Sequence, residues 1–278
     1  MPRAELPAIL GVLALLLAPP VPPIRYTSAQ LDCARFHVLT RSDIETSLAG
    51  RRRRETVEVE GRWIVRAEPA TRDSARLEAW FDTLAVWRRG PEGTLAPDTD
   101  GLIGGRYGGE LSADGHYVAE THPFVPDDLA QVVDLSDALG ELLPPVPGAP
   151  LAVGGVWRDT LRGVEIRRLT DSAAASGAKL GRYKLAVRRE ATEAPVSGDS
   201  QPIPVHQTTH EDGEFVWDPD HGFVRRKGQI VVETDIPTSG RVRRAVRSRV
   251  EQHVVVERLS AAAPCPARSA AQDRIAPP

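Results

Sequence analysis

Apolar and polar residues alternate along several segments of this chain, and this period of two restricts its fold more than any other feature. Between residues 56 and 66, one face carries Val57, Val59, Trp63 and Val65. Most of the intervening positions are charged. Because successive side chains of a β-strand point to opposite sides, this segment is predicted to be a strand with one buried and one solvated face.

Further segments indicate that consecutive strands pair in an antiparallel sheet. Residues 105–120 are predicted to form a hairpin with the turn Ala113-Asp114-Gly115, because Gly accepts the positive φ of a tight connection. Antiparallel pairing follows when strands are joined by such short turns. The other segments with strand-like patterns are residues 76–88, 163–169, 180–189, 223–236 and 241–259.

One segment has a helical pattern instead. Within residues 127–143, five apolar residues fall on one side of a helix, and Pro144 ends it. Ser136 and Gly140 interrupt the segment and favour two short helices over one long helix. The chain is therefore predicted to be mainly β, with one short helical insertion between two sets of strands.

The first 29 residues are predicted to be an export signal. Arg3 gives a positive start, residues 6–18 are apolar, and Thr27-Ser28-Ala29 supplies the small residues that a signal peptidase requires. The apolar run is shorter than the roughly 20 residues that cross a bilayer as a helix, so no stable transmembrane span is expected. We expect a soluble protein that is periplasmic or secreted after cleavage of the signal.

The rest of the chain is predicted to form a single antiparallel β domain over residues 30–260. Its composition indicates a long loop at residues 190–204, and residues 261–278 are expected to be a disordered tail. The two cysteines, Cys33 and Cys265, lie near opposite ends of the predicted mature chain. An oxidising compartment allows a disulfide between them if their Cα atoms come within about 7 Å.

Arginines are densest in the predicted last hairpin. If residues 237–239 form a three-residue loop, Asp235 faces Arg241 and Glu233 faces Arg243 across the ladder. These arginines are then a solvated strand face rather than a nucleic-acid site. The formal net charge of −3 gives no general attraction to nucleic acid, and only three of the 35 basic Lys and Arg residues are lysines. No nucleic-acid partner is predicted.

The chain carries no recognisable catalytic signature. His206 and His210 have the i, i+4 spacing of a helical zinc motif, but in a strand or loop this spacing separates the residues by about 13 Å. Asp98 and Asp100 match only a fragment of a calcium loop. We therefore predict no catalytic residue, no metal site and no cofactor. The sequence favours a non-enzymatic protein over an enzyme such as a hydrolase.

The order of the predicted elements resembles a known architecture. A long antiparallel meander, an inserted helical segment and a Pro-rich lead into Val153-Gly154-Gly155-Val156-Trp157 cover most of residues 36–259. This layout is similar to exported bacterial envelope proteins related to the lipoprotein-carrier half-barrels. The resemblance implies a curved sheet whose concave face, partly plugged by the helical segment, holds an acyl chain. Gly61-Arg62-Trp63 also resembles the Gly-x-Trp signature of the lipocalins.

Two functions are consistent with these features. The first is binding of a lipid or another apolar or amphipathic ligand in the concave face of a half-barrel. The alternative is a cell-envelope module that binds a protein partner through a sheet edge or the Arg-rich face. For the first function, the expected ligand-binding residues are Trp63, Val65, Tyr107, Leu111, Tyr183 and Leu185.

Overall fold

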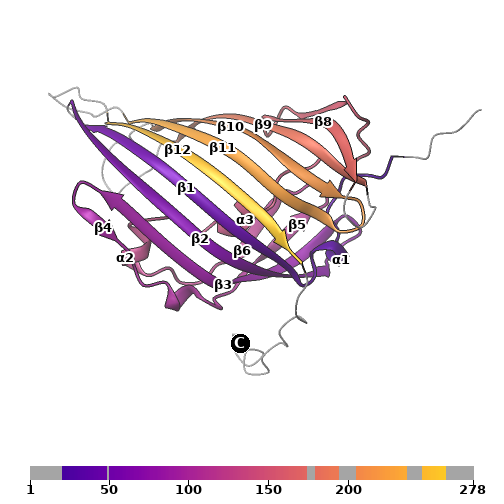
Figure 1. Ribbon diagram of the computed structural model, residues 1–278, viewed down its shortest axis with the longest axis horizontal. Helices are drawn as coiled ribbons and strands as arrows, with labels where there is room; N and C mark the ends of the chain where they lie inside the picture. Colours follow the sequence, from indigo (N-terminus) through magenta and orange to yellow (C-terminus); the bar gives the residue numbers. More distant parts are fainter. Residues whose placement is uncertain (1–20, 49, 174–178, 194–204, 237–245, 261–278) are drawn as a thin grey trace, which may run out of the picture.

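The computed structural model describes residues 21–48, 50–173, 179–193, 205–236 and 246–260 (Figure 1). These residues form one antiparallel sheet of 12 strands with a few short helices. The predicted fold class, a curved antiparallel sheet with a short helical insertion, is confirmed, and the sheet does not close into a barrel. The strands are β1 (Ala34–Leu48), β2 (Arg51–Pro69), β3 (Ser74–Gly90), β4 (Gly93–Leu95), β5 (Tyr107–Ser112), β6 (Tyr117–Thr121), β7 (Val156–Asp159), β8 (Val164–Ala173), β9 (Lys179–Glu193), β10 (Val205–Asp218), β11 (Gly222–Ile236) and β12 (Val246–Leu259).

The sheet joins two meanders through the first and last strands. Its order is β6-β5-β3-β2-β1-β12-β11-β10-β9-β8-β7, and β4 pairs with β3 beside this path. β1 pairs with β12 from Arg35 opposite Leu259 to Ser47 opposite Arg247. The short strands β6 and β7 are consequently the two edges of the sheet.

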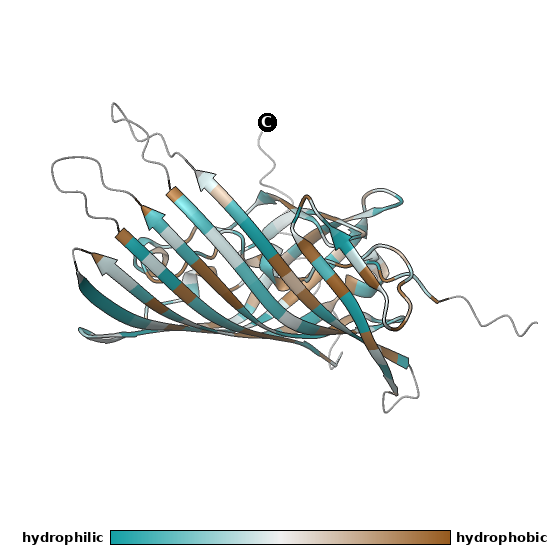
Figure 2. Ribbon diagram, turned by 90° about the horizontal axis from the view of Figure 1, so that it is seen from above, coloured by the Kyte–Doolittle hydropathy of each residue, from teal (hydrophilic) through white to brown (hydrophobic). Residues whose placement is uncertain are grey.

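The alternation in the sequence separates an apolar concave face from a charged convex face. Phe36 faces Trp63 across β1 and β2, and both are at most 2% exposed. The next residue of β1, His37, faces Arg62 on the other side of the sheet. Figure 2 shows apolar and polar residues alternating along the strands. This is the pattern expected when only one face of a sheet is packed.

Residues 122–151, which we call the plug, pack on the concave face and contain two short helices, α2 (Asp127–Ala130) and α3 (Ala138–Leu142). The predicted division of the 127–143 segment into two helices is thus confirmed. Apolar plug residues complete the core with the concave side chains of the strands. The fully buried plug residues include Leu129, Leu139, Leu142 and Val146.

A second segment, residues 24–31, crosses the core beside the plug, and we call it the strap. Ile24 donates its backbone N–H to the Ala149 carbonyl at 3.3 Å and accepts from Gly148 at 2.9 Å. The Tyr26 hydroxyl donates to the Pro144 carbonyl at 2.9 Å. The strap ends in helix α1 (Ser28–Leu31), which begins with a capping box between Thr27 and Gln30. The signal boundary predicted at residue 29 falls inside this packed segment.

An ion pair, rather than backbone hydrogen bonds between strands, links the two ends of the sheet. Arg162, in the β7–β8 turn, contacts Asp114 in the β5–β6 turn at 2.6 Å. Arg162 also pairs with Asp159 of its own turn. The β5–β6 turn has the predicted form, with Gly115 at φ +84°. This turn therefore closes a hairpin and also anchors the opposite end of the sheet.

Two sequence-based details of the loops are wrong. Asp235 faces Arg247 and Glu233 faces Arg249, so the last hairpin has a different register from the one predicted with Arg241 and Arg243. The loop predicted at residues 190–204 starts later, because β9 continues to Glu193.

The remaining predicted segments are only partly described. Residues 261–278, with Cys265, lie outside the described residues, as do Arg241 and Arg243. Cys33 lies directly before β1 with a φ of 58°. The bridge between Cys33 and Cys265 stays a prediction.

Replacing Tyr26 with Ala tests whether the strap is part of the folded core. Tyr26 is 5% exposed, and its ring lies 5.1 Å from that of Trp217. We expect Tyr26→Ala to lower the free energy of unfolding by about 3–5 kcal/mol, the usual cost of truncating a buried aromatic side chain. Urea unfolding measures the change. Leu39→Ala, at an apolar residue that is 43% exposed on β1, is the control and should cost less than about 1 kcal/mol. Equal effects of the two substitutions would contradict a packed strap.

Candidate functional site: the concave face

All six residues that the sequence predicts to bind a ligand lie on the concave face, but in its packed part. Each is at most 2% exposed. A ligand that touched them would have to displace the plug or the strap. They come from three strands: Trp63 and Val65 from β2, Tyr107 and Leu111 from β5, and Tyr183 and Leu185 from β9.

These residues belong to two aromatic clusters on opposite sides of the half-barrel. The Trp63 ring lies 3.8 Å from Phe81 and 5.0 Å from Tyr107, measured between ring centroids. On the other side, Tyr183 stacks on Phe215 at 4.9 Å. Plug side chains fill the space between the clusters. The two clusters are therefore part of the hydrophobic core. A ligand site on the concave face would lie in the parts that the plug does not fill.

A buried ion pair lies on the concave face beneath α3. Arg226 of β11 donates through Nη2 to Glu211 of β10, and their side chains are only 7% and 10% exposed. The Nη1 of Arg226 donates to the Glu141 carbonyl of α3 at 2.9 Å. We call these three residues the ionic centre. Breaking a buried pair of this kind typically costs about 3–5 kcal/mol, since one charge is left without a partner.

Two glycines allow this pair to form. Gly213 of β10 lies opposite Gly228 of β11, between the positions of Arg226 and Glu211. Neither glycine places a side chain on the concave face, so Arg226 and Glu211 can meet diagonally above them. A Cβ at Gly213 would come within 3.0 Å of Gly228 Cα, which is closer than packed atoms allow. One sequence signal could have indicated the ionic centre: Glu211 is a charged residue on the same face of the strand as the apolar Phe215.

Glu141 brings a second carboxylate to the ionic centre. Its side chain remains exposed, yet desolvation by the surrounding protein raises its pKa above the usual value. Arg226 lowers this pKa, whereas the negative charges of Asp137, Asp134 and Glu211 raise it, and the net shift is upward. The carboxyl of Glu141 therefore holds its proton to a higher pH than a free glutamate does.

Beyond the ionic centre, the concave face is less completely covered. On β12, Val256 and Val254 are 1% and 7% exposed, whereas Val250, farther along the same face, is only partly buried. Val250 lies opposite Ile44 on one side and Val232 on the other. The distal ends of β1, β2 and β12 extend away from α3 (Figure 1).

We call this part of the concave face, which no described segment packs over, the distal trough. Its outer row is apolar, because Ile44, Val250 and Val232 lie side by side, whereas the next row inward carries the polar Ser42 and Gln252 beside Ile230. Thr209 and Glu211 of β10 flank these rows opposite Val232 and Ile230. On the β2 side, the Glu55 carboxylate forms an ion pair with Arg88 Nε at 2.7 Å and a second ion pair with Arg53. The apolar residues of the floor are Ile44, Ile230, Val232 and Val250, all partly buried.

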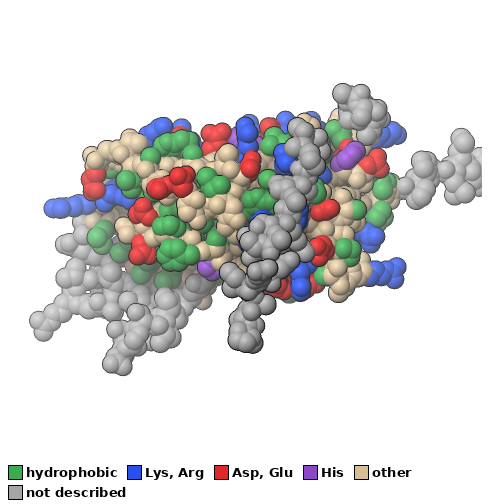
Figure 3. All heavy atoms as spheres, turned by 90° about the horizontal axis from the view of Figure 1, so that it is seen from below, with side chains coloured by type: hydrophobic (Ala, Val, Ile, Leu, Met, Phe, Trp, Pro, Cys, Tyr) green, Lys and Arg blue, Asp and Glu red, His purple; other side chains and the backbone are tan. Residues whose placement is uncertain are grey.

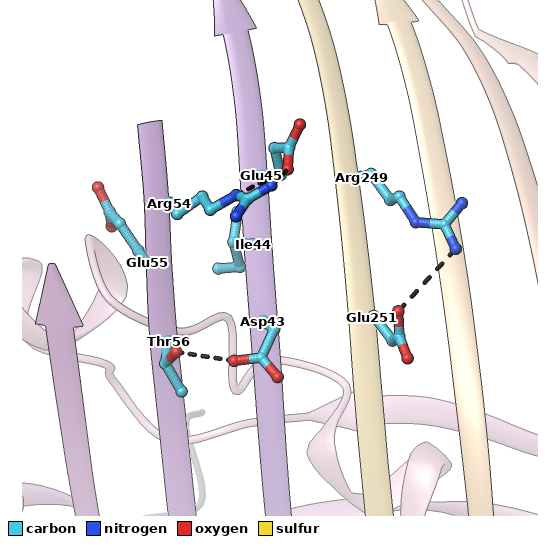
Figure 4. Close-up of a pocket in the computed structure, with 8 residues that line it drawn as sticks. All are labelled: Asp43, Ile44, Glu45, Arg54, Glu55, Thr56, Arg249 and Glu251. Atoms are coloured by element: carbon cyan, nitrogen blue, oxygen red, sulfur yellow. Dashed lines mark hydrogen bonds and ion pairs between the residues drawn. The ribbon is translucent and has the colours of Figure 1, made fainter. Parts of the chain in front are cut away.

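The convex face also has a groove, which differs in character (Figure 4). It has a volume of about 360 Å³ and lies over β2, β1 and β12. Its charged groups already have partners: Arg54 contacts Glu45 at 2.9 Å, and Thr56 donates to Asp43 at 2.7 Å. On the face that Figure 3 shows, acidic and basic side chains are similarly interspersed. This groove offers no unpaired charge cluster to a ligand.

The histidines considered as metal ligands do not form a site. His206 and His210 lie apart on β10, and His206 contacts Thr192 at 3.1 Å. His221 contacts Asp218 of its own turn at 3.2 Å. Among the described residues, no group of three His, Cys, Asp or Glu side chains has a geometry suited to a metal ion.

Sequence comparison does not assign a function. No family model matches the chain, and no curated protein matches it. Within the described ranges, no helix is long and apolar enough to span a membrane. The functional argument therefore depends on the geometry of the concave face.

Replacing Glu141 with Gln tests the electrostatics of the ionic centre. Because the pKa of Glu141 is raised in the folded state, its ionisation destabilises the fold as the pH rises above the ordinary value of 4.5. Gln resembles the protonated form. We expect Glu141→Gln to raise the melting temperature by about 1–2 °C at pH 7.5 and to leave it unchanged at pH 4.

Thermal unfolding across this pH range measures the difference. The control is Asp128→Asn on α2, an exposed carboxylate, which should change the two melting temperatures equally. A Glu141→Gln variant that is less stable than the parent at pH 7.5 would contradict the assignment.

Proposed function

We propose that this protein binds an elongated amphipathic ligand, such as an acyl chain with a polar end, in the distal trough. The observation that carries the proposal is the change in burial along the concave face. The plug and the strap cover one half completely, whereas Ile44, Val232 and Val250 in the other half remain partly accessible.

The chemistry of the trough suits a ligand with two different ends. Neighbouring apolar residues on β1, β12 and β11 give a continuous floor, because Ile44, Val250 and Val232 are in register. At its inner end, the trough meets the ionic centre, where Glu211 and Arg226 supply charged hydrogen-bonding groups. Ligand sites commonly combine a mostly apolar lining with a few convergent polar groups.

The export signal predicted at the N-terminus supports a binding role in the cell envelope or outside the cell. In that setting, a half-barrel with an accessible apolar trough can keep an acyl chain out of water. An acyl chain contributes about 0.8 kcal/mol for each buried CH₂ group, so even a short contact gives useful affinity.

Adjacent valines of β11 provide a matched test of the proposal. Val232 faces the trough and Val231 faces the convex side, because successive strand residues alternate. We expect the purified protein to yield bound lipid on extraction and mass spectrometry, and to take up a fluorescent fatty acid. Val232→Arg should weaken this uptake by about tenfold or more, because it places a charge on an apolar floor. Val231→Arg should have no effect.

Two results would contradict the proposal. One is a parent protein with neither bound lipid nor uptake of the probe. The other is equal loss of uptake in Val231→Arg and Val232→Arg variants whose circular dichroism and melting temperatures match the parent.

A further inference from the structure

A second hollow lies on the convex face, opposite the ionic centre. It has a volume of about 430 Å³ and lies over β9, β10, β11 and β12, which are in the upper front of Figure 1. The Gly213 and Gly228 pair forms part of its lining. Glycines inside strands mark sites where a sheet bends or backbones approach closely. The backbone of this pair forms part of the floor of the hollow, and the convex side chains of the neighbouring residues line it.

Three cations, Lys184, Arg225 and Lys227, line the hollow and form no ion pair among the described residues, although two carboxylates, Asp212 and Glu214, share the lining. Glu214 of β10 lies opposite Lys184 of β9 and Lys227 of β11, so the two lysines lie on either side of Glu214. Arg182, however, already contacts Glu214 at 2.8 Å. Arg225 adds a third cationic group, a guanidinium, to the lining. Within the described part of the chain, no carboxylate lies within ion-pair distance of Lys184, Arg225 or Lys227.

This arrangement differs from that of the groove in Figure 4, where Arg54 and Arg249 both have acidic partners. It is also a local feature, because the whole chain carries a formal net charge of −3. Two of the only three lysines in the sequence, Lys184 and Lys227, line this one hollow.

The hollow also contains groups that select among anions. Asp212 lies on its border and repels a ligand that is negative over its whole surface. Gln229 directs its amide nitrogen to Glu251 at 2.6 Å, so its carbonyl oxygen is the group left to accept a hydrogen bond. A ligand that satisfies both sides has an oxyanion for the cations and hydroxyl groups for Asp212 and Gln229.

We propose that this convex hollow binds a phosphate ester of a polyol, with the phosphate held by Lys184, Arg225 and Lys227. A soluble sugar or glycerol phosphate and a phosphatidylglycerol head group share this chemistry. The site is independent of the distal trough, because its side chains are on the opposite face of the sheet.

The three lysines make a direct test possible. Reductive methylation with ¹³C-formaldehyde labels Lys179, Lys184 and Lys227 and keeps their charge, and Lys→Arg variants assign the NMR signals. On titration with glycerol 3-phosphate, we expect saturable shifts of Lys184 and Lys227. Lys179, at the start of β9 and outside the hollow, is the internal control and should not shift. Equal, non-saturating shifts of all three lysines, or no shifts, would overturn the proposal.

Charge-matched variants give a second readout on the full chain. Lys184→Gln combined with Lys227→Gln should weaken binding by about tenfold or more, because it removes two charge-assisted contacts. Lys179→Gln combined with Arg76→Gln changes the net charge equally at exposed positions elsewhere and should bind like the parent. Equal weakening in the two double variants would overturn the proposal.

Vesicles distinguish the two sources of the phosphate ester. Co-sedimentation with phosphatidylcholine vesicles that contain phosphatidylglycerol, lost in the Lys184 and Lys227 double variant, identifies a lipid head group. Binding of glycerol 3-phosphate without co-sedimentation identifies a soluble ligand. If neither probe depends on Lys184 and Lys227, the hollow is not a phosphate-ester site.

Discussion

An open sheet with one apolar face must cover that face with another part of its own chain. In a closed barrel the sheet protects itself, but here the edges β6 and β7 do not pair, and the plug and the strap supply the missing layer. Burial of these segments against the concave strands contributes to the core of the fold, since apolar area removed from water dominates folding energetics. The position of the trough follows from how far this cover extends.

The ionic centre lies where the cover becomes incomplete. Arg226 links β11, β10 and α3 through Glu211 and the Glu141 carbonyl, so it fixes the plug relative to the sheet. The centre therefore separates a packed half of the concave face from a half that is accessible to solvent.

The local parts of the fold could be predicted from the sequence. Alternation at Val57, Val59 and Val65 identifies strand β2, and Asp114-Gly115 identifies the turn between β5 and β6, because both signals depend on nearby residues only. The concave position of the six predicted ligand residues follows from the same alternation. Their complete burial does not, because it depends on which distant segments pack over them.

Long-range features left no local signal. The pairing of β1 with β12 joins opposite ends of the chain, and nothing in either strand identifies its partner. Residues 24–29 of the strap also fall within the predicted export signal, because small residues before Gln30 fit a cleavage site as well as a helix cap. The register of the last hairpin was predicted from an assumed loop at residues 237–239, whereas the structure places Asp235 opposite Arg247. Glu211, a charge at an inward position, was the one local sign of the ionic centre.

The pairing of β1 with β12 also sets an order of assembly during synthesis. β1 can pair with β2 as soon as both have been made, but its other edge has no partner until the 14 residues of β12 follow. An unpaired strand edge readily adds strands from other chains, and contacts between distant residues form slowly. The growing chain therefore has an aggregation-prone edge for almost its whole synthesis, and only its final strand removes that edge.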